Sequence, residues 1–254
     1  MNRIPKQVLR RMGFIRDRRG IARRYLNESE NWKEHLEKSR SFILRCMEKS
    51  RAGGATVLGS GWWLDIPVTE LAARFSPLRF VDIYHPPEIR KKAEKYPDIQ
   101  LIEADITGGV ALRMYEAVRN RQKKKPVLAE MNSAGYKPDF DPGFVISLYL
   151  SQMDIILMDY WTGYITANEE EVLAFRKQIQ QQHLAFLQQH ESCLITDTYE
   201  VKIYRKSREM TKQLVHIPLP ETRLKDHWIW VFDISRTYDP DAVTSFEIQA
   251  RCLI

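Results

Sequence analysis

Residues 56–67 read Thr-Val-Leu-Gly-Ser-Gly-Trp-Trp-Leu-Asp-Ile-Pro, and this stretch decides the fold. An apolar run over residues 55–58 leads into the turn Gly59 to Gly61, and a helical pattern of apolar residues begins at Val68. A strand, a Gly-x-Gly turn and a helix in this order are typical of a nucleotide-binding turn, because glycine lets the backbone pass close to a ligand. A tight strand-to-helix turn also uses glycine when no ligand is bound. The turn alone therefore leaves both interpretations open.

Short apolar runs alternate with helix-length segments along the rest of the chain. This alternation indicates βαβ units, with a mostly parallel sheet and helices on both faces. Only a turn-rich segment, residues 233–244, separates the last two runs, which predicts an antiparallel hairpin at the end of the sheet. The seven predicted strands are residues 55–58, 78–83, 99–104, 144–150, 193–196, 228–232 and 246–253.

Two carboxylates lie at the carboxyl ends of consecutive predicted strands. Asp82 follows Gly59 by 23 residues, close to the spacing of about 20 at which an acidic side chain binds ribose hydroxyls. Asp105 lies one strand further out, in reach of an adenine amino group. A nicotinamide-binding domain accounts for the first acid and gives no reason for the second. The pair therefore favours an adenosyl ligand without a pyrophosphate.

With these features, residues 50–254 resemble the class I S-adenosylmethionine-dependent methyltransferases. That family has a Rossmann-like α/β fold, a seven-stranded mostly parallel sheet that ends in an antiparallel hairpin. The Leu-Gly-Ser-Gly-x-x-Leu-Asp-Ile-Pro form of the loop looks like a bacterial branch of the family. The resemblance implies S-adenosylmethionine as cofactor and in-line methyl transfer to an undetermined acceptor.

The resemblance also implies a set of site residues. The turn from Gly59 to Gly61 would approach the methionine part of the cofactor, Asp82 would hold the ribose, and Asp105 would help to frame the adenine. The predicted cofactor-binding residues are Gly59, Ser60, Gly61, Trp62, Asp82, Ile83, Asp105, Ile106 and Ser147. Beyond the fourth strand, the predicted substrate contacts are Tyr149, Gln152 and Tyr160. No general base and no metal ligand is assigned.

The chain departs from the family pattern at two positions. Val57 stands where the family usually has an acidic residue, and Trp63 stands where it often has a third glycine. Asp65 either replaces the missing acid near the ammonium group of the ligand or forms the N-cap of the helix that follows. The departures motivate an alternative function, a non-catalytic module that holds an adenosyl ligand or an anionic partner such as RNA.

Composition and charge restrict the remaining classes. With 254 residues, 44% of them hydrophobic, the chain is neither disordered, collagen-like nor a disulfide scaffold. The net charge of +6 is concentrated in residues 1–24, which carry nine basic residues against Asp17. We expect residues 1–26 to form a basic, solvated and partly disordered arm, with contact to an anionic partner as the alternative. A helix starting at Asn27 should pack on the main domain, residues 53–254.

Several motifs are absent from the sequence. Neither an Asn-Pro-Pro-aromatic nor a Pro-Cys sequence follows the fourth strand, which disfavours methylation of nucleic-acid bases. Cys46, Cys193 and Cys252 form no zinc-binding pattern, which favours a reduced, cytoplasmic protein. His183 and His190 lie about two helical turns apart, so we interpret both as surface or packing residues.

Overall fold

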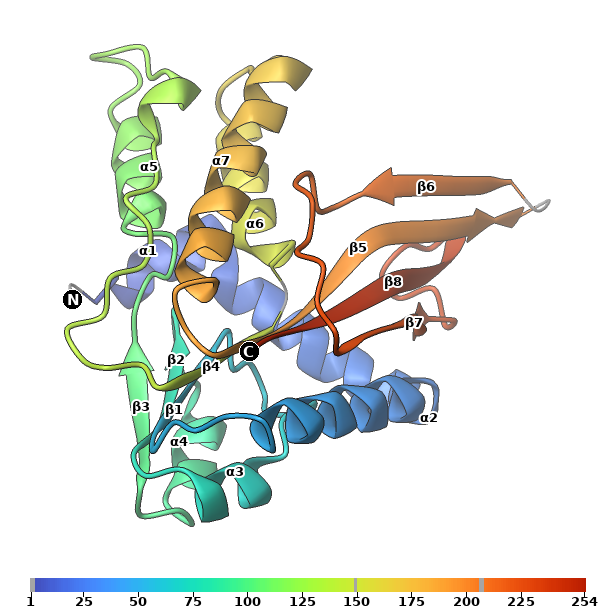
Figure 1. The fold of residues 1–254 in the computed structure, drawn as a ribbon. Helices are drawn as coiled ribbons and strands as arrows, with labels where there is room; N and C mark the ends of the chain where they lie inside the picture. The colour runs from blue at the N-terminus through green and yellow to red at the C-terminus, as the bar shows by residue number, and fades with distance from the viewer. Residues whose placement is uncertain (1–2, 149, 206–207) are drawn as a thin grey trace.

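The computed structural model describes residues 3–148, 150–205 and 208–254, and within them eight strands form one sheet. The strand order is β3-β2-β1-β4-β5-β8-β7, and β6 pairs with β5 outside this path (Figure 1). The strands are β1 (Ala55–Leu58), β2 (Leu78–Asp82), β3 (Ile99–Glu103), β4 (Phe144–Leu148), β5 (Ser192–Tyr204), β6 (Glu209–Gln213), β7 (Lys225–Asp233) and β8 (Ala242–Leu253). The first five are parallel, whereas β8 runs antiparallel to both β5 and β7. This is a Rossmann-like α/β fold with a C-terminal antiparallel hairpin.

The central strands are buried on both faces because their sequences are continuous apolar runs. Every residue of β1 and of β4 is buried. Strand β2 pairs with β1 on one side, and β4 pairs with β1 on the opposite side. The order of the strands therefore reverses between β1 and β4, and a crevice at their carboxyl ends is the usual place for a ligand in such a sheet.

Helices cover both faces of the sheet (Figure 1). The helices are α1 (Lys6–Met12), α2 (Phe14–Met47), α3 (Val68–Arg74), α4 (Pro87–Ala93), α5 (Val110–Arg119), α6 (Gln152–Thr162) and α7 (Glu169–Leu187), with a 3-10 turn η1 (Leu128–Glu130). The second half of α2 packs with α3 and α4 on one face. On the other side of the sheet α1, α5, α6 and α7 share an apolar cluster. At the start of α7, Asn168 and Glu171 form a capping box.

The structure confirms the seven predicted strands and the hairpin at the end of the sheet. Three strands are longer than predicted, because β5, β7 and β8 extend beyond their predicted ends as neighbours in the antiparallel part of the sheet. One strand, β6, is absent from the prediction. All five of its residues are exposed, so its sequence lacks the apolar pattern on which the prediction depends. Cys193 and Cys252 are paired in the β5–β8 ladder, and Cys46 joins them in the same cluster as a third free thiol.

The N-terminal region corrects the sequence analysis. Residues 6–12 and 14–47 are helical, and the prediction of a solvated leader over residues 1–26 is wrong for the part of it that the structure describes. Val8, Leu9 and Met12 are buried against α5 and α6. The apolar residues of this segment recur at helical spacing, which predicts an amphipathic helix. The same segment is rich in basic side chains, and the solvated leader was predicted from these.

The helix expected to start at Asn27 instead continues from Phe14 and kinks at Glu28, where φ is −116° and ψ is 16°. The buried Glu28 carboxylate accepts a hydrogen bond from the Ser235 backbone N–H at 2.8 Å and one from the Asn31 side chain at 2.6 Å. These contacts tie the kink to the loop after β7. Each half of α2 therefore follows its own direction (Figure 1).

Candidate functional site

A cavity of about 540 Å³ lies at the carboxyl edge of the sheet where the strand order reverses. Its volume falls within the range of small-molecule sites, roughly 300–1,000 Å³. The turn after β1, the ends of β2, β3 and β4, the first half of α2 and part of β5 contribute to its wall. All nine residues predicted to bind the cofactor line it: Gly59, Ser60, Gly61, Trp62, Asp82, Ile83, Asp105, Ile106 and Ser147.

The glycine turn is built from left-handed backbone. Gly59 has a φ of 71° and Gly61 a φ of 55°. A Cβ atom on Gly59 would lie 3.0 Å from the Leu148 carbonyl oxygen, so glycine is required for the close approach of this turn to β4. Trp63 has a φ of 60° as well, and its buried ring packs against Phe80 with the centroids 4.3 Å apart. Trp63 thus takes a backbone conformation that favours glycine at the position where the sequence departs from the family pattern.

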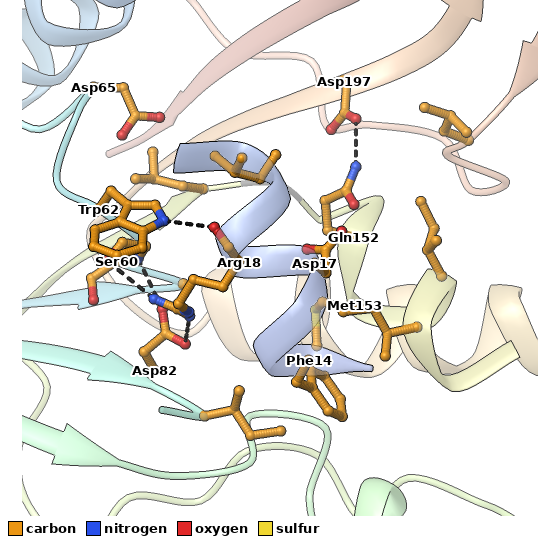
Figure 2. A pocket seen from close by; sticks show the side chains of 18 of the residues that line it. Phe14, Asp17, Arg18, Ser60, Trp62, Asp65, Asp82, Gln152, Met153 and Asp197 are labelled. Carbon is orange, nitrogen blue, oxygen red and sulfur yellow. Dashed lines mark hydrogen bonds and ion pairs between the residues drawn. The ribbon is translucent and has the colours of Figure 1, made fainter. Parts of the chain in front are cut away.

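Asp82 ends β2 and faces the glycine turn. Its Oδ2 accepts a hydrogen bond from the Gly61 backbone N–H at 2.8 Å. Its Oδ1 accepts a charge-assisted hydrogen bond from the Arg18 guanidinium of α2, and Arg18 also donates to the Gly61 carbonyl oxygen at 3.1 Å. The Trp62 indole N–H donates to the Arg18 carbonyl oxygen at 2.9 Å. Figure 2 shows Arg18 reaching from α2 to Asp82 beside Trp62.

Asp105 holds the turn that leads into α5. Its Oδ1 accepts hydrogen bonds from the Thr107 backbone N–H at 2.9 Å and the Thr107 hydroxyl at 2.5 Å, and its Oδ2 accepts one from the Ala111 N–H at 3.0 Å. The carboxylate therefore satisfies free N–H groups at the start of a helix. Its contact with adenine stays a prediction, with Ile83 and Ile106 as the apolar lining nearby.

A serine and a histidine meet at the end of β4. The Ser147 Oγ and the His183 Nε2 are 2.7 Å apart, and both residues line the cavity. Burial lowers the pKa of His183 to about 4, so its imidazole is neutral at pH 7. His183 is 2% exposed, which confirms the packing role considered in the sequence analysis, whereas its place in the cavity wall was not predicted. Pairing a strand end with a helix 36 residues away is a tertiary event that no local pattern encodes.

The predicted substrate residues have different outcomes. Gln152 lines the cavity and donates its side-chain N–H to Asp197 Oδ2 at 2.9 Å (Figure 2). Tyr160 does not line this cavity and packs between Tyr115 and Tyr164, so its contact with a substrate stays a prediction. Tyr149 lies outside the described residues.

Asp197 was missed because the fifth strand was predicted to end one residue before it. It is 1% exposed, and its Oδ1 accepts a hydrogen bond from the Ser151 hydroxyl. Burial raises the pKa of the Asp197 carboxyl, while the hydrogen bonds from Ser151 and Gln152 oppose the rise. Asp197 thus fixes the orientation of Gln152 at one end of the cavity.

Asp65 lines the cavity and is 6% exposed. The following helix α3 begins at Val68 with Pro67 at the N-cap position and no side-chain cap. Asp65 is therefore not the N-cap of that helix. Its contact with the ammonium group of a ligand stays a prediction.

The described residues contain no group of three or more His, Cys, Asp or Glu side chains placed to hold a metal ion. In the same part of the chain, no helix has both the length and the apolar character needed to cross a bilayer.

No protein-family model matches this chain, and no curated protein matches it. Among solved structures, one match covers 98% of this chain and 98% of the other, with 8% sequence identity and a TM-score of 0.39. The matched structure is a complex of DhpI with SAH. The fold assigned above rests on strand order and register, not on this likeness.

Proposed function

We propose that this protein is an S-adenosylmethionine-dependent methyltransferase that transfers a methyl group in line to an undetermined acceptor. The observation that carries the proposal is the position of Asp82, bonded to the Gly61 N–H at 2.8 Å and facing the cavity beside the glycine turn. A carboxylate at this place is suited to accept hydrogen bonds from a ribose hydroxyl pair. Membership of a bacterial branch of the family stays a prediction.

The cavity wall also fits the other parts of an adenosyl ligand. Among the described residues, the buried Ser60 hydroxyl lines the cavity and has no hydrogen-bond partner. A polar ligand group would satisfy it, since a buried hydroxyl without a partner is costly. Ile83 and Ile106 offer apolar surface near Asp105, as an adenine ring requires. Asp65 lies in the same wall and suits an ammonium group.

S-adenosylmethionine, when bound, supplies an activated methyl group, so the protein acts chiefly by positioning. Gln152, oriented by Asp197, presents an amide to the cavity and can hold a polar acceptor. Ser147, held by His183, presents a hydroxyl at the end of β4. No residue is assigned to remove the proton of the acceptor.

The test is calorimetric titration of the full chain with S-adenosylmethionine, S-adenosylhomocysteine and NAD. We expect micromolar binding of the first two and no binding of NAD. Asp82→Asn keeps the shape of the side chain and removes its charge, so it should weaken S-adenosylhomocysteine binding about tenfold or more. Binding of NAD alone, or an unchanged affinity in Asp82→Asn, would contradict the proposal.

The alternative function is a non-catalytic binding module, and the ion pair between Arg18 and Asp82 favours it. Each carboxylate oxygen of Asp82 already accepts a hydrogen bond from the protein, as expected for a site that binds no ligand. The exposed arginines of the N-terminal region, Arg10, Arg16, Arg19 and Arg23, would then be free to engage RNA or another anion. This module should bind RNA with a steep dependence on salt and should ignore S-adenosylhomocysteine. The enzyme and the RNA-binding form of the module therefore differ in the same titration.

A further inference from the structure

The first half of α2, residues 14–27, lies across the cavity, and we call this segment the strap. Five of its residues line the cavity: Phe14, Asp17, Arg18, Ile21 and Arg24. The strap thus forms part of the wall of the proposed cofactor site although it precedes the whole sheet in sequence. In Figure 2 it is the blue helix that runs between Asp82 on one side and Gln152 on the other.

Both ends of the strap are anchored to the body. At its start, Met12 and Ile15 are buried in the cluster formed with α5 and α6. At its end, Glu28 bonds to Ser235, and the Trp32 indole N–H donates to the Phe232 carbonyl oxygen at 2.8 Å. The strap is therefore a bridge held on two sides of the sheet, with the site beneath its middle.

Arg18 is the contact at the middle of the bridge. Its guanidinium reaches both Asp82 Oδ1 and the Gly61 carbonyl oxygen, while Trp62 bonds to its backbone carbonyl. The Arg18 side chain is 14% exposed and that of Asp82 is 6% exposed, so water competes little with this ion pair. With the Gly61 N–H on Oδ2, each oxygen of Asp82 already accepts a hydrogen bond from the protein.

We propose that the strap is autoinhibitory: Arg18 and the ribose of an adenosyl ligand compete for Asp82, so that ligand binding lifts the strap from the site. The inference rests on the proposed function, because it assigns the ribose to Asp82. A strap docked in about nine molecules of ten lowers the apparent affinity tenfold below the intrinsic value. Removing Arg18 should therefore strengthen binding by about this factor.

The first experiment compares calorimetric titrations of S-adenosylhomocysteine into wild type, Arg18→Ala and Arg19→Ala. Arg19 is the matched control, since it is the next residue of the same helix, carries the same charge and is exposed. Arg18→Ala should bind about tenfold more tightly than wild type, and Arg19→Ala should match wild type. Circular dichroism would verify that each variant is folded.

The outcomes separate the inference from the function on which it rests. If none of the three proteins binds, the proposed function fails and the inference fails with it. If all three bind equally, the ligand site stands and the strap does not compete. Weaker binding in Arg18→Ala would make Arg18 part of the ligand site, which also overturns the inference.

The second experiment uses wild type alone, so it does not depend on a variant that folds. Amide hydrogen exchange is followed with and without saturating S-adenosylhomocysteine. Ligands usually slow exchange near their site, whereas a displaced strap should exchange faster over residues 14–27 when the ligand is bound. Slower or unchanged exchange in that segment, in a protein that binds the ligand, would overturn the inference.

Discussion

Gly59 and Trp63 show how single residues set the geometry of the site. Both have a left-handed backbone, yet one has no side chain and the other fills a buried space against Phe80. At Gly59 the constraint comes from the backbone of β4, because any Cβ would press on the Leu148 carbonyl oxygen. At Trp63 the packing of the ring offsets the cost of the backbone, which is of the order of 1–3 kcal/mol.

The cost of a side chain at Gly59 can be measured directly. Gly59→Ala should lower the free energy of unfolding by about 1–3 kcal/mol, since alanine is strained at a positive φ and its Cβ meets backbone. Gly53→Ala is the control, because a Cβ there meets nothing within 4 Å. It should stay within about 0.5 kcal/mol of wild type or gain slightly. Urea unfolding of the two variants would refute this reading if their losses were equal.

At the scale of elements, α1 and the strap are the part of the chain whose role changed most between sequence and structure. The nine basic residues of residues 1–24 indicated a solvated arm, but several of them contact the body. Arg11 donates to the Tyr115 hydroxyl at 2.8 Å, and Arg24 lies over the Phe232 ring at 4.6 Å. Part of the positive charge of the N-terminal region is therefore held against the body of the protein.

If α1 is docked through its apolar face, truncating that face should destabilise the whole domain. Leu9 is 2% exposed in the cluster with α5 and α6. Leu9→Ala should lower the free energy of unfolding by about 2–5 kcal/mol. Arg10→Ala, on the exposed side of the same helix, should change it by less than about 0.5 kcal/mol. Equal and small effects of both substitutions on thermal or urea unfolding would support the prediction of a solvated arm.

At the scale of the whole molecule, buried histidines on different elements share one consequence for stability. Burial lowers the pKa of His183 on α7 to about 4 and that of His35 on α2 to about 3. The unfolded chain therefore takes up protons, from its ordinary pKa of about 6.5, that the folded chain does not. Their contribution to stability is complete above pH 6.5 and is lost as the pH falls toward 4.

Asp154 acts in the opposite direction, because burial raises its pKa to about 7. The folded state then binds a proton that the unfolded carboxyl releases, so this group favours folding as the pH falls below 7. Between pH 6.5 and 5, His183→Asn should lose about 1.4 kcal/mol less per pH unit than wild type. Asp154→Asn should lose about 1.4 kcal/mol more per pH unit. Urea unfolding at several pH values gives both slopes, and parallel curves would contradict the assignment.

Local patterns in the sequence were enough to predict seven of the strands, the glycine turn and the places of Asp82 and Asp105 at strand ends. These features depend on local periodicity and on glycine, which short-range physics controls. The local patterns did not indicate β6, because its five exposed residues carry no apolar pattern.

Only the tertiary structure decided what covers the site and what orients its polar groups. Arg18 meets Asp82 across 64 residues, and Ser151 meets Asp197 across 46. Such pairs form because separate elements pack in one arrangement. The local sequence pattern around either residue does not indicate which residue it will contact. The charge of the N-terminal region suggested an outside partner, but burial of its apolar face against α5 and α6 directs it onto the protein itself.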